Sequence, residues 1–377
     1  MYDVPHLRFP EFSGEWERKR LKDVCNIRTG NKNTQDKSDN GIYPFYVRSQ
    51  IVERINSWTF DGEAILTAGD GVGVGKVFHY STGKIGVHQR VYILSDFKCD
   101  GKYLYSYFAG NFYNRVKRMS AKNSVDSVRM EMIADMPIAL PSIEEQKKIG
   151  HLLALLDDRI ATQNKIIEKL QSLIKGIVDE LMTVLLKGEL YPFASLYIKA
   201  GEGGTPTTSV SKYYSGGSIP FIKIDDLSQK YLTSNKDFIT ELGMQKSSAW
   251  LIPSQSVIYS NGATIGAISI NKYPVCTKQG ILGIVPNINV NVEYLYLLMS
   301  SSYFSKEVGR IITEGTMKTA YLKDINHIKS PLPSKAQQQN ITNLTSSIEK
   351  KRNHSIFRHD NFIGCFSADK IKMSARK

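Results

Sequence analysis

The sequence has no apolar run long enough to cross a lipid bilayer, and only 41% of its residues are hydrophobic. Its first segment is interrupted by Asp3, His6, Arg8 and Glu11, so it lacks the apolar core of a secretory signal. These absences predict a protein without membrane contact that is located in the cytoplasm.

The residue clusters that most metal sites and catalytic sites need are also missing. The four cysteines, Cys25, Cys99, Cys276 and Cys365, include no Cys-x-x-Cys pair, and the seven histidines are not at metal-ligand spacing. No two prolines are adjacent, which excludes the Asn-Pro-Pro-Tyr type of segment of adenine methyltransferases. We therefore expect no metal, no catalytic residue and no cofactor on this chain.

Length and charge give the next limits. A chain of 377 residues is long for one hydrophobic core, which favours two domains. The net charge is +13, and residues 1–142, 143–188, 189–333 and 334–377 have excesses of +4, 0, +3 and +6. Because almost half of the excess lies in the last of these segments, basicity supports contact with phosphates only weakly and does not locate it.

An internal repeat at a separation of 192 residues organises the chain. Ile-Ala-Leu-Pro-Ser at 138–142 recurs as Ser-Pro-Leu-Pro-Ser at 330–334, and Gln146 matches Gln338. Gly71 and Gly262 form a looser match further upstream. In each half, strand-like runs punctuated by Gly, Asn and Asp are followed by a segment with helical spacing, at 101–119 and 292–312. The repeat unit is therefore a mixed α and β domain followed by a helix.

A long helix is predicted between the two domains. Ser142 and Glu145 form a capping box at its start, and Gly188 with Pro192 ends it. From 143 to 186 it would be about 65 Å long. Apolar residues spaced alternately by four and three predict a coiled-coil seam, which favours a spacer over the alternative of a helix buried in one large core. The seam comprises Ile149, Leu153, Leu156, Ile160, Ile167, Leu170, Ile174, Ile177, Leu181 and Val184.

The second copy of the helix departs from this pattern. Ser334 and Gln337 repeat the capping box, but the run Lys-Lys-Arg-Asn-His at 350–354 interrupts the apolar spacing. A short or atypical second helix with a basic tail is predicted. The expected fold is α+β with a pseudo-twofold repeat, divided into a first domain at 1–142, a central spacer helix at 143–188, a second domain at 189–333, and the second helix with its tail at 334–377.

This order of variable domain, long helix opened by Leu-Pro-Ser, second variable domain and second such helix resembles the specificity (S) subunits of type I restriction–modification systems, the HsdS family. Leu-Arg-Phe-Pro-Glu-Phe at 7–12, Trp16 and Leu-Lys-Asp-Val at 21–24 also resemble the start of many members. The resemblance covers roughly residues 5–350.

The resemblance implies a non-catalytic subunit that gives a restriction–modification complex its DNA sequence specificity. Each of its two target-recognition domains would read one part of a split site in double-stranded DNA, and the helices would set the gap and dock the methyltransferase (M) subunits. S-adenosylmethionine and ATP would bind to the partner subunits, which include a restriction and translocation (R) subunit. A coiled-coil interaction module that binds no DNA is the alternative, and an enzyme with an unrecognised site is a further one.

Loops that contain both hydrogen-bonding and basic side chains are the candidate DNA contacts. In the first domain they are Arg28, Thr29, Asn31, Lys32, Tyr46, Arg48, Ser49, Gln50, His88, Gln89, Arg90, Lys122 and Asn123. In the second domain they are Thr205, Thr207, Lys223, Asp225, Lys278, Gln279, Thr316 and Lys318.

The glycine-rich stretch at 69–76 invites a nucleotide-binding interpretation. However, Asp70 stands where a P-loop needs its first glycine, and Lys76 is followed by Val77 rather than by Ser or Thr. A turn between two strands is the preferred interpretation of this stretch.

Overall fold

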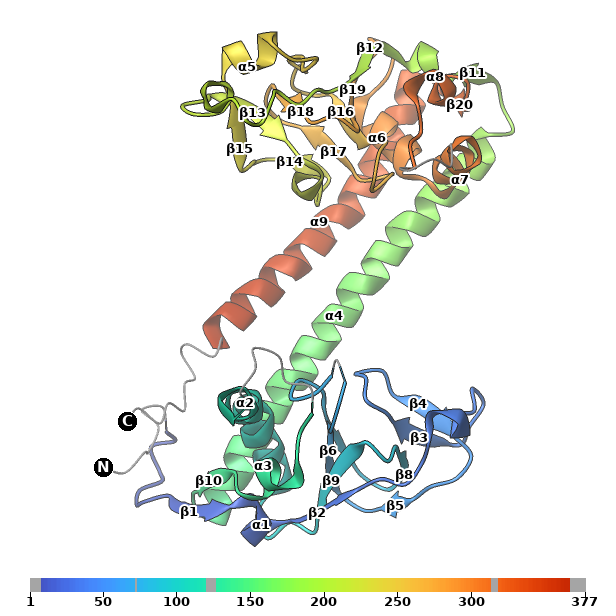
Figure 1. Ribbon diagram of the computed structural model, residues 1–377. Helices are drawn as coiled ribbons and strands as arrows, with labels where there is room; N and C mark the ends of the chain where they lie inside the picture. The colour runs from blue at the N-terminus through green and yellow to red at the C-terminus, as the bar shows by residue number, and fades with distance from the viewer. Residues whose placement is uncertain (1–7, 72, 120–126, 313–317, 367–377) are drawn as a thin grey trace. The chain divides into compact units, whose positions relative to one another are not determined.

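A computed structural model describes residues 8–71, 73–119, 127–312 and 318–366 (Figure 1). The chain divides into two compact units, Met1–Asn164 with His359–Lys377, and Lys165–Arg358. The division falls inside one continuous helix, α4 (Ile143–Leu185). The division into four segments predicted above stays a prediction.

The first unit contains a domain built mainly from short strands, with two helices after them. Its elements before α4 are β1 (Glu17–Arg20), α1 (Leu21–Val24), β2 (Asn26–Thr29), the 3-10 helix Thr34–Asp36, β3 (Tyr43–Tyr46), β4 (Glu53–Ile55), β5 (Phe60–Asp61), β6 (Ala64–Ala68), β7 (Phe78–Ser81), β8 (Lys84–Val87), β9 (Val91–Ser95), α2 (Gly101–Met119), α3 (Met130–Ala134) and β10 (Pro137–Leu140).

The second unit repeats this order after α4. Its elements are β11 (Leu190–Pro192), β12 (Tyr197–Glu202), β13 (Ile219–Ile222), β14 (Tyr231–Leu232), β15 (Asp237–Ile239), α5 (Glu241–Gln245), β16 (Val257–Ser260), β17 (Ile268–Asn271), β18 (Cys276–Thr277), β19 (Ile281–Pro286), α6 (Val292–Ser300), α7 (Ser302–Ile311), α8 (Leu322–Ile325), β20 (Lys329–Pro331) and α9 (Lys335–Phe366), with 3-10 helices at Phe193–Leu196, Ser211–Tyr213 and Ile224–Asp226.

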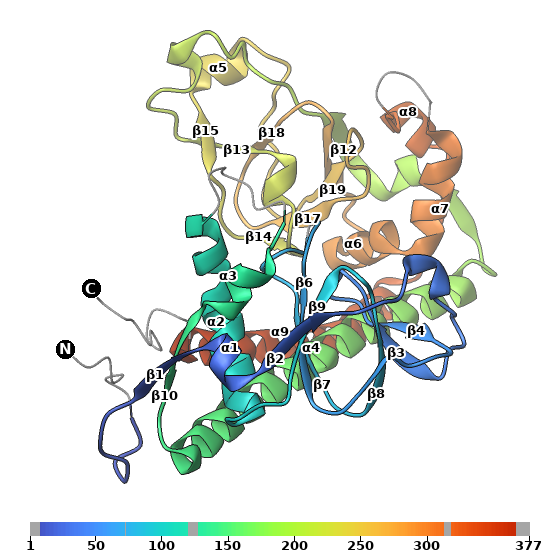
Figure 2. The ribbon, with the colours of Figure 1, turned by 60° about the horizontal axis from the view of Figure 1, so that its bottom comes forward.

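The strand order confirms the internal repeat. One sheet runs β2-β9-β6-β7 in the first unit, and β12-β19-β16-β17 is its counterpart in the second, extended there by β14. A second sheet runs β4-β3-β8-β5, matched by β15-β13-β18, and both contain one parallel pair, β3 with β8 and β13 with β18. The antiparallel pair β1 and β10 (Figure 2) is matched by β11 and β20. Two mixed α and β domains of one topology therefore make up the chain.

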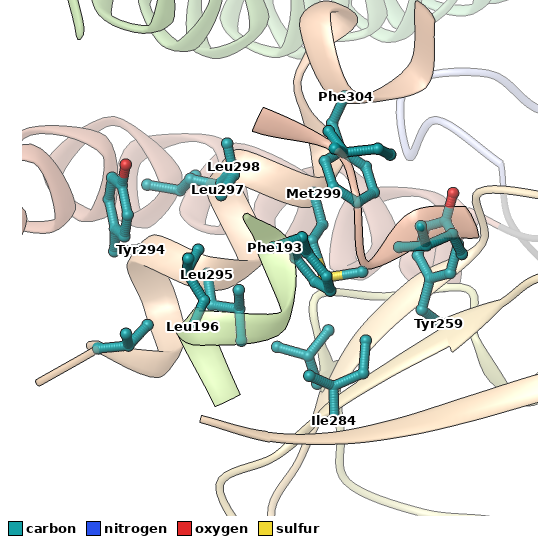
Figure 3. Packing of buried hydrophobic residues seen from close by; sticks show 14 of the residues in the cluster. Phe193, Leu196, Tyr259, Ile284, Tyr294, Leu295, Leu297, Leu298, Met299 and Phe304 are labelled. Carbon is teal, nitrogen blue, oxygen red and sulfur yellow. The ribbon is translucent and has the colours of Figure 1, made fainter. Parts of the chain in front are cut away.

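Each domain has its own hydrophobic core between a sheet and the helices that follow it. In the second domain, Phe193 and Phe304 lie next to each other with ring centroids 5.2 Å apart, and Tyr259 from β16 meets Phe304 edge-on (Figure 3). Val178 and Met182 of α4 and Ile341 of α9 belong to the same buried cluster. Both long helices are thus anchored in the second domain.

The two domains are joined to the starts of their helices by the same hydrogen bonds. The Gln146 side chain accepts the Asp100 N–H at 3.0 Å and donates to the Pro141 carbonyl at 2.8 Å. Gln338 likewise accepts the Asn291 N–H at 2.7 Å and donates to the Pro333 carbonyl at 2.8 Å. The glutamines that mark the repeat in the sequence therefore perform one structural task.

The two capping boxes differ in the structure. Ser334 and Gln337 form the complete reciprocal box, with the Ser334 N–H donating to the Gln337 side chain at 3.0 Å. At the start of α4 the Glu145 N–H donates to the Ser142 hydroxyl at 3.3 Å, but the Glu145 carboxylate binds both Nε and Nη2 of Arg8, each at 2.7 Å. The prediction that the Glu145 side chain bonds back to the helix start is therefore wrong, because Arg8 binds the Glu145 carboxylate through two hydrogen bonds.

The helix α4 ends within one residue of its predicted end, and nine of its ten predicted seam residues are half-buried. Ile149 packs against the first core, while Ile174 and Leu181 pack against the second. Val184 is 62% exposed. The seam as a contact between two helices stays a prediction.

The helix α9 has 32 residues against 43 in α4, and its backbone continues through 350–354. Charged and polar residues interrupt an apolar seam without breaking a helix, since Lys and Arg have good helix propensity. The helical segment predicted at 292–312 is instead two helices, α6 and α7. Ser301 has an extended backbone and caps α7 by accepting the Phe304 N–H.

A buried ion network ties α9 to the second domain. Lys230 Nζ lies 2.6 Å from the Glu293 carboxylate of α6 and 2.7 Å from the Glu349 carboxylate of α9, and its side chain is only 7% exposed. The rings of Tyr231 and Tyr296 lie 5.4 Å from the same ammonium group. One lysine therefore pairs with two carboxylates from two helices.

Candidate nucleic-acid interface

Three of the predicted loops of the first domain lie together at one end of its sheets. The Gln89 N–H donates to the Lys32 carbonyl at 2.8 Å, and the His88 N–H donates to the Tyr46 carbonyl at 3.0 Å. Gly30 permits this approach, because a Cβ there would lie 2.2 Å from the Val87 carbonyl oxygen. The segments that follow β2, β3 and β8 thus form one surface.

The glycine-rich stretch joins β6 to β7, which are antiparallel neighbours, so the interpretation as a turn is confirmed. It brings Asp70 to the same surface. One Asp70 oxygen lies 2.9 Å from Arg48 Nη1, and the other lies 3.7 Å from Arg90 Nε. Three loops that are distant in the sequence therefore contribute one acidic and two basic side chains to a single cluster.

Two open hollows adjoin this cluster. The larger has a volume of about 550 Å³ and is lined by Asn33, Thr34, Gln35, Arg48, Asp70, His88, Gln89 and Arg90. The second, of about 430 Å³, is lined by Thr29, Gly69, Asp70, Gln89, Arg90, Tyr92, Ser127, Val128, Arg129, Met130 and Glu131. Their lining is mostly polar, which suits hydrogen bonding to a polar ligand.

Other predicted residues of the first domain lie apart from the cluster or are not accessible. Arg28 lies over the Phe60 ring, 5.2 Å from its centroid, in a separate hollow of about 450 Å³. Tyr46 is buried, and its hydroxyl donates to Ser81 at 3.0 Å. Ser49 and Gln50 are exposed on the loop after β3. Lys122 and Asn123 lie outside the described residues.

His88 is buried and has a defined protonation state. Its Nδ1 accepts the Arg90 N–H at 3.0 Å, and its Nε2 lies 3.4 Å from the Thr34 hydroxyl, so the neutral tautomer with the proton on Nε2 fits both neighbours. Burial lowers the pKa of His88, and the positive charge of Arg48 lowers it further. A neutral His88 therefore holds the backbone of Arg90.

Because the pKa of His88 is below the unfolded value of about 6.5, the folded domain should lose stability as the pH falls from that value through the folded pKa. Histidine C2–H exchange measured by mass spectrometry should give a lower pKa for His88 in the native protein than in urea. The variant His88→Asn keeps an acceptor near Nδ1 and should weaken this pH dependence; an unchanged dependence would contradict the assignment.

The second domain brings its counterpart loops together in the same way. The Lys278 N–H donates to the Ile222 carbonyl and the Gly204 N–H donates to the Thr277 carbonyl, both at 3.0 Å. Thr207, Asp225, Gln279 and Lys318 are exposed, and Lys223 pairs with Asp237 at 2.9 Å. The Thr205 hydroxyl is buried with no hydrogen-bond partner among the described residues. Thr316 lies outside the described residues.

The strand register corrects one pairing of the repeat. Asp70 follows the end of β6 by two residues, as Gly262 follows the end of β16, and the last residues of these strands pair with Val91 and Ile281. Gly262 is therefore the counterpart of Asp70 and not of Gly71. The sequence comparison missed this because the two turns have different lengths.

Sequence reasoning missed Asp70, Arg129 and residues 33–35. Asp70 had been set aside as part of a turn, because its contacts with Arg48 and Arg90 join loops that are distant in the sequence. Among the residues that the structure describes, no group of three or more His, Cys, Asp or Glu could hold a metal ion. No helix in the described part of the chain is long and apolar enough to cross a membrane.

Comparison with known proteins identifies the family. The model of the type I restriction modification DNA specificity domain matches residues 13–172 and again residues 197–356. The chain therefore belongs to the family of type I restriction–modification DNA specificity domains, and the two matches coincide with the two structural repeats.

Individual relatives agree with this assignment. The chain is 28% identical over 176 residues to the type I restriction enzyme EcoDI specificity subunit of Escherichia coli, a match that covers 47% of this chain and 39% of that protein. It is 24% identical over 385 residues to the MjaVIII specificity subunit of Methanocaldococcus jannaschii, covering 92% and 89%. The chain thus spans well under two thirds of the length of the EcoDI subunit, whereas it spans most of the MjaVIII subunit.

The fold agrees with a solved structure. The S subunit of a type I restriction–modification system from M. genitalium aligns over 100% of both chains with a TM-score of 0.67 at 13% identity. At that identity the likeness concerns the fold alone, and it supports two mixed α and β domains with long helices.

Proposed function

We propose that this chain is the DNA sequence-specificity subunit of a type I restriction–modification complex and reads a split site in double-stranded DNA with its two domains. One observation carries the proposal: each domain, matched by the same specificity-domain model, presents the same set of loops at the same strand ends. Two readers of one fold with different loop side chains suit a site made of two different parts.

The loop chemistry supports DNA as the ligand. The exposed side chains of Arg48, Arg90 and Lys278 and the half-buried Lys32 can neutralise phosphates, while Gln89 and Gln279 can donate to and accept from base edges. The chain itself supplies recognition and no chemistry, so S-adenosylmethionine and ATP belong to the methyltransferase and restriction subunits of the complex.

The helix α4 offers a surface for the methyltransferase subunit. Leu155 in the first unit and Leu173 in the second are 52% and 49% exposed. Exposed leucines on a long helix provide apolar area that another protein can cover. A methyltransferase subunit is the partner that the proposed function requires there, and the restriction subunit would join through that assembly.

The double substitution Arg28→Ala with Lys32→Ala tests DNA contact by the first domain. If both side chains bind phosphates, the slope of log affinity against log salt should fall by about two, and specific affinity should drop. Fluorescence anisotropy of the full chain with the methyltransferase subunit encoded beside it is the measurement.

Arg118→Ala is the matched control, since it removes one exposed positive charge from α2 of the same domain. An unchanged slope in the double variant would reject the contact by these residues. Absence of any salt-dependent DNA binding by the wild-type complex would reject the proposed function.

A further inference from the structure

We propose that the part of the DNA site read by the first domain contains a guanine, and that Arg48 and Arg90 read it while Asp70 positions them. The inference rests on the proposed function and names the base that this cluster recognises. The second domain has no such arginine and aspartate cluster, so its part of the site is read by lysine, amide and hydroxyl groups.

The distribution of arginine first distinguishes the two domains. Residues 1–142 contain ten arginines, whereas residues 189–333 contain one, Arg310. Arg310 lies on α7 and pairs with Glu307 of the same helix. Lysine is plentiful in both segments, so the difference is not one of total charge. Arginine is the side chain whose planar fork matches the O6 and N7 acceptors of guanine.

The backbones of both arginines are fixed by the turn that carries Asp70. The Gly69 N–H donates to the Arg90 carbonyl at 2.8 Å. Gly73 lies against Arg48, since a Cβ at Gly73 would be 2.3 Å from the Arg48 carbonyl oxygen. His88 holds the Arg90 N–H from the other side. The turn, together with His88, therefore fixes the main-chain positions of Arg48 and Arg90.

Asp70 then holds one edge of the Arg48 guanidinium group by a hydrogen bond and lies within ion-pair distance of the Arg90 guanidinium group. Its two oxygens engage Arg48 Nη1 and Arg90 Nε separately, at 2.9 and 3.7 Å. Neither contact uses Nη2 of either arginine, and both side chains are exposed at the rim of the same hollow. An arginine held at one edge keeps N–H groups for a base and loses less conformational entropy on binding.

The positions of the second domain that are equivalent to Asp70 and Arg90 are glycines, which have no side chain. Gly262 is the counterpart of Asp70, and Gly280, which directly precedes β19 as Arg90 precedes β9, is the counterpart of Arg90. The Asn261 N–H donates to the Gly280 carbonyl at 3.0 Å, as Gly69 does to Arg90. The backbone frame is thus shared, while the charged side chains belong to the first domain alone.

Selection of bound duplexes from a random DNA library tests the inference, with the full chain in complex with its methyltransferase subunit. The wild-type complex should select a split site with guanine in one part. Arg48→Ala and Arg90→Ala should each weaken binding roughly tenfold and remove the preference for guanine at one position of that part. Replacing this guanine by 7-deazaguanine, which lacks the N7 acceptor, should weaken binding by the wild type roughly tenfold and leave binding by a variant with both Arg48→Ala and Arg90→Ala unchanged.

Asp70→Asn separates positioning from folding. It should relax the same guanine position with both arginines present, leave the other part of the site unchanged, and shift the melting temperature by no more than about 2 °C, because exposed ion pairs contribute little stability. Asp39→Asn and Arg118→Ala are matched controls, since both change an exposed charge of the same domain outside the cluster.

The outcomes distinguish the two proposals. Sequence selection with no guanine at the position that the arginine variants relax would overturn this inference and leave the proposed function standing. Loss of guanine preference in the arginine variants but not in Asp70→Asn would overturn the role of Asp70. No sequence selection by the wild-type complex would overturn the proposed function and the inference with it.

Discussion

Replacing Lys230 by methionine should destabilise the second domain by about 3–5 kcal/mol, because the buried carboxylate of Glu349 and the half-buried carboxylate of Glu293 would lose their counter-charge. Methionine fills most of the volume of the lysine stem, so lost packing contributes little. The expected loss is large compared with the effect of a surface salt bridge, which is typically below about 1 kcal/mol.

Native-state hydrogen exchange, read separately for peptides of α6, α9 and β14, would locate the destabilisation. Adding Glu293→Gln and Glu349→Gln should restore most of the stability, since neutral amides replace the unpaired charges. Lys246→Met, at an exposed position of the same domain, is the control, and equal stability of the two lysine variants would disprove the network's role.

Replacing Leu173 by aspartate should weaken association with the methyltransferase subunit roughly a hundredfold or more. A carboxylate buried in an apolar interface without a partner costs several kcal/mol. In the free chain Leu173 is 49% exposed, so the helix and the domain should tolerate the change.

Co-purification and light scattering of the chain with the methyltransferase subunit would measure the association. Gln171→Asp, an exposed position on the same helix, introduces the same charge and should have little effect. Leu155→Asp makes the same test on the first unit. Full association of both leucine variants would show that the methyltransferase subunit docks elsewhere.

Much of the fold could be predicted because the residues that recur in the repeat start helices, end helices or fix them to a domain. The helix α2 has the predicted bounds Gly101–Met119, and α4 ends within one residue of its prediction. These segments have strong helical periodicity and explicit ends, which are local properties of the chain. Gln146 and Gln338 recur at equivalent positions of the repeat because each makes the same side-chain hydrogen bonds to the main chain of its domain.

The remaining features depend on contacts between distant residues, which periodicity does not encode. Strand order was not predicted, because short strands rich in β-branched residues fit either sheet. The contact of Arg8 with Glu145 spans 137 residues and replaced half of a capping box that local spacing had predicted. The cluster of Arg48, Asp70 and Arg90 likewise exists only after three loops meet, so Asp70 gave no functional signal in isolation.

The join between each domain and its helix also bears on how freely this sequence can change. The side chains of Gln146 and Gln338 bond only main-chain atoms of the domain, and Tyr103 and Tyr294 donate to main-chain carbonyls in the same way. Main-chain groups are present whatever residue occupies a position. A domain can therefore accumulate substitutions across its reading surface, or be exchanged for a relative with the same backbone at its ends, while one glutamine and one tyrosine per repeat keep these main-chain contacts.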